Sequence, residues 1–158
     1  MTQLYFAFGS NMSSVTLHDR GVDAKSAGAA LLENHRLSFT LPSKRWTGRA
    51  ADIRPAPGGG VWGVLWELAE PHALDPYELR YDRQEVDVLQ FPSDRSSLSK
   101  RAFTYTVKPE HRAADEAPPA DEYLSRMIEG AIDAGLPAYY TDFLRNFAST
   151  EPSSGPSP

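Results

Sequence analysis

The sequence predicts a mixed α/β (α+β) domain with a mostly β core, followed by a short tail. Short apolar runs bounded by glycine, proline or asparagine fill the first two thirds of the chain, as in strands joined by turns. The last third holds two segments whose apolar residues recur with the period of a helix. We place one domain at residues 1–147 and a flexible tail rich in proline and serine at 148–158.

The first strand is predicted over Leu4–Phe8, an apolar and aromatic run that ends at the turn-forming Gly9-Ser10-Asn11. Ser13 or Ser14 can cap a short helix that reaches about His18, because a hydroxyl at the N-cap accepts a backbone N–H.

The central strands are predicted at Ala29–Leu32, Arg36–Leu41, Ala50–Arg54 and Val61–Leu68. The segment Pro57-Gly58-Gly59-Gly60 separates the last two, so we expect them to pair as a hairpin around it.

A short helix is predicted from Pro71 to about Leu79, because proline is well tolerated in a first helical turn. Two further strands are predicted at Val86–Leu89 and Phe103–Val107, and the polar segment Pro92–Lys100 is expected to form the loop between them.

Two helices end the domain. The first has apolar residues at helical spacing and is ended by Gly135 and Pro137. The second is predicted over Ala138–Phe147. The apolar residues of the first are Tyr123, Leu124, Met127, Ile128, Ala131 and Ile132.

Composition excludes several classes of function. The chain has no cysteine, which rules out disulfides, thiol nucleophiles and iron–sulfur clusters, and its four histidines lack a metal-ligand spacing. We therefore expect no metal and no cofactor. A net charge of −5 argues against nucleic acid. No run approaches the ~20 apolar residues of a membrane span, and no secretory leader is recognisable, so we expect no membrane contact and a cytoplasmic location.

The turn from Phe8 to Met12 is the first segment that could carry chemistry. A glycine turn between a strand and a helix presents N–H groups that can hold a carboxylate or an oxyanion. Ser10 lacks the second glycine of a nucleophile elbow, so a serine hydrolase is disfavoured. A plain turn with an Asn or Ser cap stays open as the alternative.

Glu78 is the second candidate. It follows apolar Leu74 and Tyr77, and a carboxylate in such surroundings can act as a general base. A solvated Glu78 paired with Arg80 or Arg83 is the alternative that pattern alone favours. Glu67 is a competing carboxylate.

These segments resemble the γ-glutamylcyclotransferases. The resemblance runs in order from Leu4 to about Phe147. It is carried by Tyr5-Phe6-Ala7-Phe8-Gly9-Ser10-Asn11-Met12, Val61-Trp62-Gly63-Val64-Leu65-Trp66, Leu74-Asp75-Pro76-Tyr77-Glu78, Tyr81-Asp82-Arg83, Val86-Asp87-Val88, Tyr105 and Gly135-Leu136-Pro137 with Tyr140.

The resemblance implies a small β-barrel-like mixed sheet with flanking helices, and release of 5-oxoproline from a small γ-glutamyl substrate. It implies Glu78 as the catalytic acid and base. It also implies a substrate site formed by Tyr5, Phe6, Ala7, Phe8, Gly9, Ser10, Asn11, Tyr81 and Tyr105.

This sequence departs from the family pattern at Phe8, where a tyrosine is usual, and at Leu79, where a glycine commonly follows the glutamate. The link from Glu78 to Tyr81 is also short. These departures motivate a second hypothesis, a non-catalytic module that binds a γ-glutamyl or amino-acid ligand. Exposed aromatic residues on the last helix would permit a homodimer.

Overall fold

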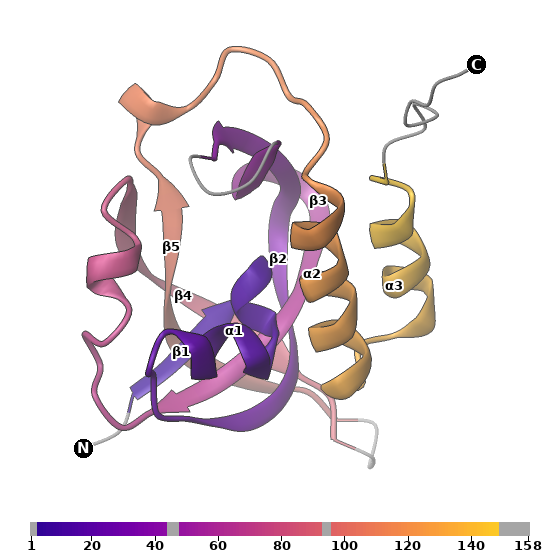
Figure 1. Cartoon of the computed structure of the whole chain (residues 1–158). Helices are drawn as coiled ribbons and strands as arrows, with labels where there is room; N and C mark the ends of the chain where they lie inside the picture. Colours follow the sequence, from indigo (N-terminus) through magenta and orange to yellow (C-terminus); the bar gives the residue numbers. More distant parts are fainter. Residues whose placement is uncertain (1–2, 44–47, 93–95, 149–158) are drawn as a thin grey trace.

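The sheet closes into a five-stranded barrel, and helices cover its outside (Figure 1). The computed structural model describes residues 3–43, 48–92 and 96–148. The order around the barrel is β1-β3-β2-β4-β5; the contact of β1 with β5 is parallel and the others are antiparallel. The strands are β1 (Gln3–Ala7), β2 (Ala24–Pro42), β3 (Arg49–Leu68), β4 (Tyr81–Gln90) and β5 (Leu98–Val107). The expected barrel-like mixed sheet is confirmed.

The predicted hairpin around the triple glycine is wrong. Both of its arms belong to the single strand β3, and both pair with β2, which joins the two strands predicted at Ala29–Leu32 and Arg36–Leu41. The pairs Glu33–Gly60 and His35–Pro55 leave residues 56–59 as a bulge opposite Asn34. The amide N–H of Gly58 donates to the Asn34 side chain (3.1 Å), so the glycine segment kinks the strand without reversing it.

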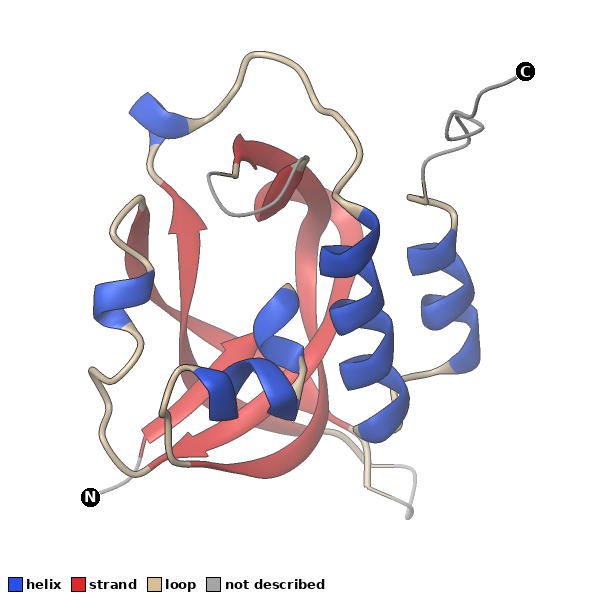
Figure 2. Cartoon of the chain, in the orientation of Figure 1, coloured by secondary structure: helices blue, strands red, loops and turns tan. Residues whose placement is uncertain are grey.

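Within the part of the chain that the structure describes, three helices and three single 3-10 turns lie around the barrel (Figure 2). Figures 1 and 2 show α2 and α3 side by side along one flank. Within the described ranges no helix has both the length and the apolar character needed to cross a lipid bilayer. The elements are η1 (Ser10–Met12), α1 (Ser14–Asp19), η2 (Asp75–Tyr77), η3 (Pro109–His111), α2 (Asp121–Asp133) and α3 (Ala138–Arg145).

The predicted helix from Pro71 to Leu79 is reduced to the single turn η2. Pro76 lies in the middle of that segment, and its missing N–H and bulky ring prevent a longer helix. As a result Glu78 follows the turn in a non-helical conformation, with φ −123° and ψ 39°.

The other elements follow the sequence closely. The Ser13 hydroxyl caps α1 by accepting the Thr16 N–H (3.3 Å), as predicted. The predicted loop after Pro92 is shorter than expected, because β5 begins at Leu98; residues 93–95 lie outside the described residues. The last helix ends at Arg145, not Phe147. Residues 149–158 of the predicted tail also lie outside the described ranges.

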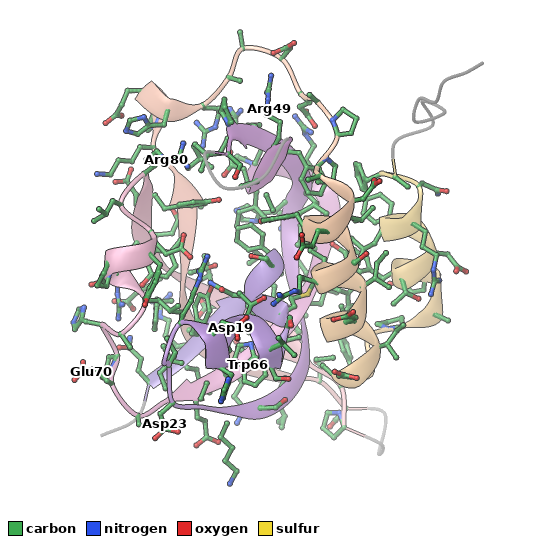
Figure 3. The ribbon with its side chains drawn as sticks, in the orientation of Figure 1. Asp19, Asp23, Arg49, Trp66, Glu70 and Arg80 are labelled. Atoms are coloured by element: carbon green, nitrogen blue, oxygen red, sulfur yellow. The ribbon has the colours of Figure 1, made fainter. Side chains whose placement is uncertain are left out.

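The barrel interior and the helix contacts form one apolar core. Phe6, Phe39 and Phe103 are almost fully buried inside it, whereas charged side chains such as those of Asp23 and Glu70 lie at the outer edge (Figure 3). Helix α2 packs directly on η1. A side chain at Gly130 would collide with the main chain of Met12, so only glycine permits this close approach.

One carboxylate lies in this interior. Asp52 is fully buried on β3 and accepts four hydrogen bonds. Its two oxygens receive the Thr40 hydroxyl (3.0 Å), the Arg112 Nε (2.8 Å) and the amides of Ile53 (2.9 Å) and Val107 (3.0 Å). These partners come from β2, β3, β5 and the segment after η3, so Asp52 joins the main elements at one end of the sheet.

Candidate active site

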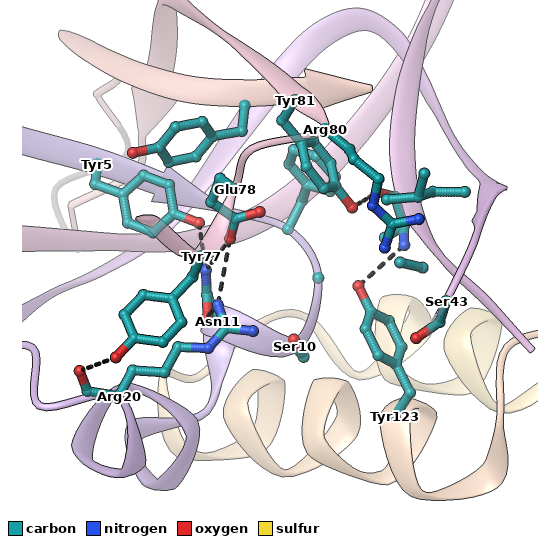
Figure 4. A pocket seen from close by; sticks show the side chains of 16 residues that line it. Tyr5, Ser10, Asn11, Arg20, Ser43, Tyr77, Glu78, Arg80, Tyr81 and Tyr123 are labelled. Carbon is teal, nitrogen blue, oxygen red and sulfur yellow. Dashed lines mark hydrogen bonds and ion pairs between the residues drawn. The ribbon is translucent and has the colours of Figure 1, made fainter. Parts of the chain in front are cut away.

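A cavity of about 210 Å³ lies where η1, η2, α2 and the strands meet. It collects residues that are far apart in the sequence, as Figure 4 shows. Eight of the ten residues expected at the site line it: Tyr5, Phe8, Gly9, Ser10, Asn11, Glu78, Tyr81 and Tyr105.

Phe6 and Ala7 do not line this cavity. Both are fully buried on β1 and pack in the apolar core. The expectation that these two side chains contact substrate is therefore not supported by their position.

Glu78 projects into the cavity from the end of η2. Its side chain is only 11% exposed, so the solvated alternative is wrong. The Asn11 side-chain amide donates to its Oε1 at 3.1 Å, and Arg20 forms an ion pair with the same oxygen at 3.3 Å. Among the described residues Oε2 receives no hydrogen bond, and Figure 4 shows it turned toward the open space beside Tyr81 and Tyr123.

The expected pairing of Glu78 with a neighbour in sequence is also wrong. Arg80 donates to the Pro42 carbonyl (2.7 Å), and Arg83 pairs with Asp75 (3.4 Å). The cation beside Glu78 is Arg20, 58 residues earlier in the chain.

The surroundings of Glu78 change its acidity. Burial raises the pKa of Glu78 to about 7, even though the Arg20 charge and the Asn11 hydrogen bond act in the opposite direction. Close to neutral pH the carboxyl group is therefore populated in both protonation states. A general acid and base needs this property.

Asn11 links the turn to this carboxyl group. Besides Glu78, its amide contacts the Tyr5 hydroxyl (3.0 Å), and its side-chain oxygen accepts from Arg20 (3.0 Å). Its backbone carbonyl accepts the Trp66 indole N–H (3.0 Å). The asparagine is thus more than a helix cap, because its side chain and main chain both hold partners at the site.

On the opposite wall of the cavity, Tyr81 and Tyr123 are both hydrogen-bonded to the main chain of Ala51 in β3. The Tyr81 hydroxyl donates to the Ala51 carbonyl (2.9 Å), and the Ala51 N–H donates to the Tyr123 hydroxyl (2.9 Å). A Cβ at Gly9 would lie 2.7 Å from that same hydroxyl. Glycine at position 9 therefore leaves room for Tyr123 to enter the cavity from α2.

Tyr105 closes the wall beside Tyr5, with its ring 5.7 Å from that of Tyr5. Its hydroxyl donates to Asp75 at 2.6 Å, and Arg83 and His72 also contact this carboxylate. The side chain is thereby fixed against η2, which also carries Glu78 at its end.

Sequence reasoning missed eight of the sixteen described residues that line the cavity, among them Arg20, Tyr77 and Tyr123. Arg20 lies in a turn after α1 and reaches Glu78 only through the tertiary fold. Tyr77 and Tyr123 line the cavity but stand in the sequence as ordinary apolar helix positions. A tyrosine hydroxyl that would need a partner in the core is the single signal that could have marked Tyr123.

Candidate metal ligands do not gather here or elsewhere: the described ranges hold no group of three or more His, Asp or Glu residues able to hold an ion. The barrel and its cavity define a class of protein, a small α+β domain whose cavity is lined, within the described ranges, by one carboxylate, that of Glu78.

The chain belongs to the AIG2-like family, whose model matches residues 60–144. It is 28% identical to a mouse protein named gamma-glutamylcyclotransferase, over 95% of this chain and 81% of the relative. It is 29% identical to the human protein of the same name, over 90% and 77%. A solved structure of a gamma-glutamyl cyclotransferase superposes with a TM-score of 0.83, at 27% identity, over 99% of this chain and 94% of that one.

The resemblance drawn from the sequence motifs is confirmed by these relatives. They place the chain in the gamma-glutamylcyclotransferase class of enzymes.

Proposed function

We propose that this enzyme releases 5-oxoproline from a small γ-glutamyl amino acid or amine, with Glu78 as the general acid and base. The observation that carries the proposal is Glu78 itself. Among the described residues it is the one carboxylate that lines the cavity, burial raises its pKa to about 7, and one of its oxygens faces the open space.

The reaction needs one proton acceptor that later becomes a donor. Glu78 removes a proton from the substrate α-ammonium, and the free amine attacks the γ-carbonyl carbon. The new C–N bond closes a five-membered ring, and the carbonyl electrons move to oxygen. When the intermediate collapses, the original C–N bond breaks and the leaving amine takes one proton from Glu78. The ring nitrogen loses its second proton to that amine, which departs as an ammonium ion.

The cavity favours this ring closure by position. The amine and the carbonyl belong to the same molecule, so holding the chain bent places them at reacting distance. Gly9 and Ser10 line the cavity, and the N–H groups of this turn would stabilise the developing oxyanion.

The two side-chain departures from the family pattern have unequal weight. Leu79 is 74% exposed and does not line the cavity. Phe8 does line it and is buried, so the hydroxyl that it lacks would affect substrate choice. Phe8 is thus the observation in favour of the alternative, a non-catalytic module that binds the same ligands.

The variant Glu78→Gln tests the proposal, with Glu67→Gln as its control because Glu67 lies on β3 outside the cavity. We expect Glu78→Gln to lower kcat for 5-oxoproline release by about 10²–10⁴-fold and Glu67→Gln to leave it unchanged. Release would be measured on γ-glutamyl-alanine, a γ-glutamyl-lysine derivative and glutathione.

Full activity of Glu78→Gln would contradict the assignment. If the unaltered enzyme turns over no γ-glutamyl compound but such a compound raises its melting temperature, the binding module is the better description. A cytoplasmic location stays part of the proposal and would be checked by imaging the tagged full chain.

A further inference from the structure

Arg20 lines the cavity and contacts the carboxyl group of Glu78. It follows α1, and its NH1 donates both to the Asn11 side-chain oxygen (3.0 Å) and to Glu78 Oε1 (3.3 Å). Its side chain is 17% exposed. Its Nε is buried and meets no acceptor among the described residues, so the arginine is held here at the cost of one unmade hydrogen bond.

Tyr77 contacts Arg20 through both its hydroxyl group and its ring. The Tyr77 hydroxyl donates to the Arg20 carbonyl (3.0 Å), and the guanidinium carbon lies 5.1 Å from the centre of the Tyr77 ring. Two consecutive residues therefore hold Arg20. The Tyr77 hydroxyl bonds the Arg20 carbonyl and the Tyr77 ring packs on the guanidinium group, while Glu78 pairs with the Arg20 charge.

We propose that Arg20 is a positioning residue, which binds Glu78 Oε1 so that Oε2 is presented to the substrate amine and which keeps the carboxyl group ionisable near neutral pH. The inference rests on the proposed function in one respect: it takes Glu78 to be the group that exchanges protons with substrate.

Among the described groups that face Glu78, Arg20 is the one that forms an ion pair with it. Tyr5 from β1, Tyr81 from β4 and Tyr123 from α2 face it, and burial raises the pKa of each, so they are neutral. The Asn11 amide from η1 is also neutral. Among the described residues Arg80 is the other cation of the cavity lining. Its charge also lowers the pKa of Glu78, but less than that of Arg20, and its NH1 donates to the Pro42 carbonyl.

Arg20 opposes the effect of burial on Glu78. Its charge is the largest of the influences that lower the pKa of Glu78, and burial is the larger influence that raises it. A cation within about 4–6 Å typically lowers a carboxyl pKa by roughly 1–3 units. Without Arg20 the carboxyl group would be mostly protonated at neutral pH, so a smaller fraction of it could accept the substrate proton.

Arg126 offers a matched control. It is 18% exposed, close to the 17% of Arg20, and it bonds Thr16 (2.9 Å) and Asp19 (3.7 Å) of α1. It does not line the cavity. A merely structural role for Arg20 predicts that Arg20→Gln and Arg126→Gln behave alike.

The test is a carbon-13 titration of the glutamate carboxyl groups in the full chain, with the Glu78 signal identified by its loss in Glu78→Gln. We expect Arg20→Gln to raise the Glu78 pKa by about one unit or more. Arg126→Gln should leave it unchanged. Arg20→Lys, which retains the charge, should keep the pKa close to that of the unaltered protein while lowering kcat.

The acid limb of the kcat/KM profile for 5-oxoproline release should move with the titration. A titration of Arg20→Gln that coincides with that of the unaltered protein would overturn the inference, as would an equal shift in Arg126→Gln. If Arg20→Gln does not fold, Arg20→Lys still decides: unchanged kcat in that variant contradicts the positioning role.

The outcomes separate the two proposals. An unaltered protein that turns over no γ-glutamyl compound refutes the proposed function, yet the titration still reports whether Arg20 sets the protonation of Glu78. An active protein whose Arg20→Gln variant loses rate equally at every pH keeps the proposed function and refutes the role of Arg20.

Discussion

Two buried carboxylates in this barrel have opposite surroundings. Asp52 accepts four hydrogen bonds, shared between both of its oxygens, and is fully enclosed. Glu78 receives both of its donors on Oε1, and its other oxygen faces a cavity. Both have an arginine partner, Arg112 and Arg20 respectively.

The contrast shows that burial and an ion pair do not by themselves mark a catalytic carboxylate. A carboxylate whose oxygens are all occupied by protein donors is already satisfied and cannot take a proton from substrate without breaking the structure. The useful sign is an oxygen that is buried enough to be poorly solvated yet lacks a protein donor.

Removing the charge of Asp52 is the largest expected effect on stability. Asp52→Asn puts an amide where four donors converge and leaves Arg112 without its counter-charge, so we expect a loss of about 3–5 kcal/mol in the free energy of unfolding. Urea unfolding measures it, with the exposed Asp82→Asn as control. A loss below about 1 kcal/mol would remove the distinction between the two carboxylates.

Glu78 should show the opposite behaviour, since its ionisation opposes folding. Its folded pKa, about 7, lies above the unfolded value near 4.5, so the folded protein binds the proton more tightly and loses stability as pH rises from about 4.5 to 7. The cost is largest above pH 7 and amounts to at most about 3 kcal/mol.

Glu78→Gln removes this cost. The melting temperature of the variant minus that of the unaltered protein should therefore be several degrees larger at pH 8 than at pH 5. Glu67→Gln should show no such difference. A constant offset at both pH values would mean that Glu78 ionises as easily in the folded chain as in the unfolded one.

The smallest effect is expected at Tyr81, which stands between the two carboxylates. Burial raises the pKa of its hydroxyl, Glu78 and Asp52 add to that effect, and the hydroxyl donates to the Ala51 carbonyl. Tyr81→Phe removes that bond and should cost about 1 kcal/mol of stability, with KM within a few-fold of the original. A large rise in KM at unchanged stability would instead assign the hydroxyl to substrate binding.

The sequence predicts the local parts of this molecule well. The Ser13 cap and the end of α2 at Gly135 and Pro137 depend on neighbouring residues, and the structure confirms them. The hairpin at the triple glycine fails because a bulge and a turn share the same residues, and only the long partner β2 decides between them.

The site divides in the same way. Glu78 and most of the Tyr5–Asn11 segment reach the cavity, as the motifs suggested. The partner of Glu78 could not be read from the sequence, because Arg80 and Arg83 are closer along the chain while the fold brings Arg20 to the carboxylate. An ion pair between residues 58 positions apart produces no periodic pattern in the sequence from which it could be predicted.

The bulge at residues 56–59 allows the length of β3 to change without a change in its pairing register with β2. Pairing with β2 resumes on both sides of it, at Pro55 and Gly60, and none of its residues lines the cavity. Extra residues inserted between Pro57 and Gly58 would extend an exposed protrusion while each half of β3 keeps its own partners. The barrel thus offers a point at which a peptide tag or a reporter domain can be grafted with the Glu78 cavity left undisturbed.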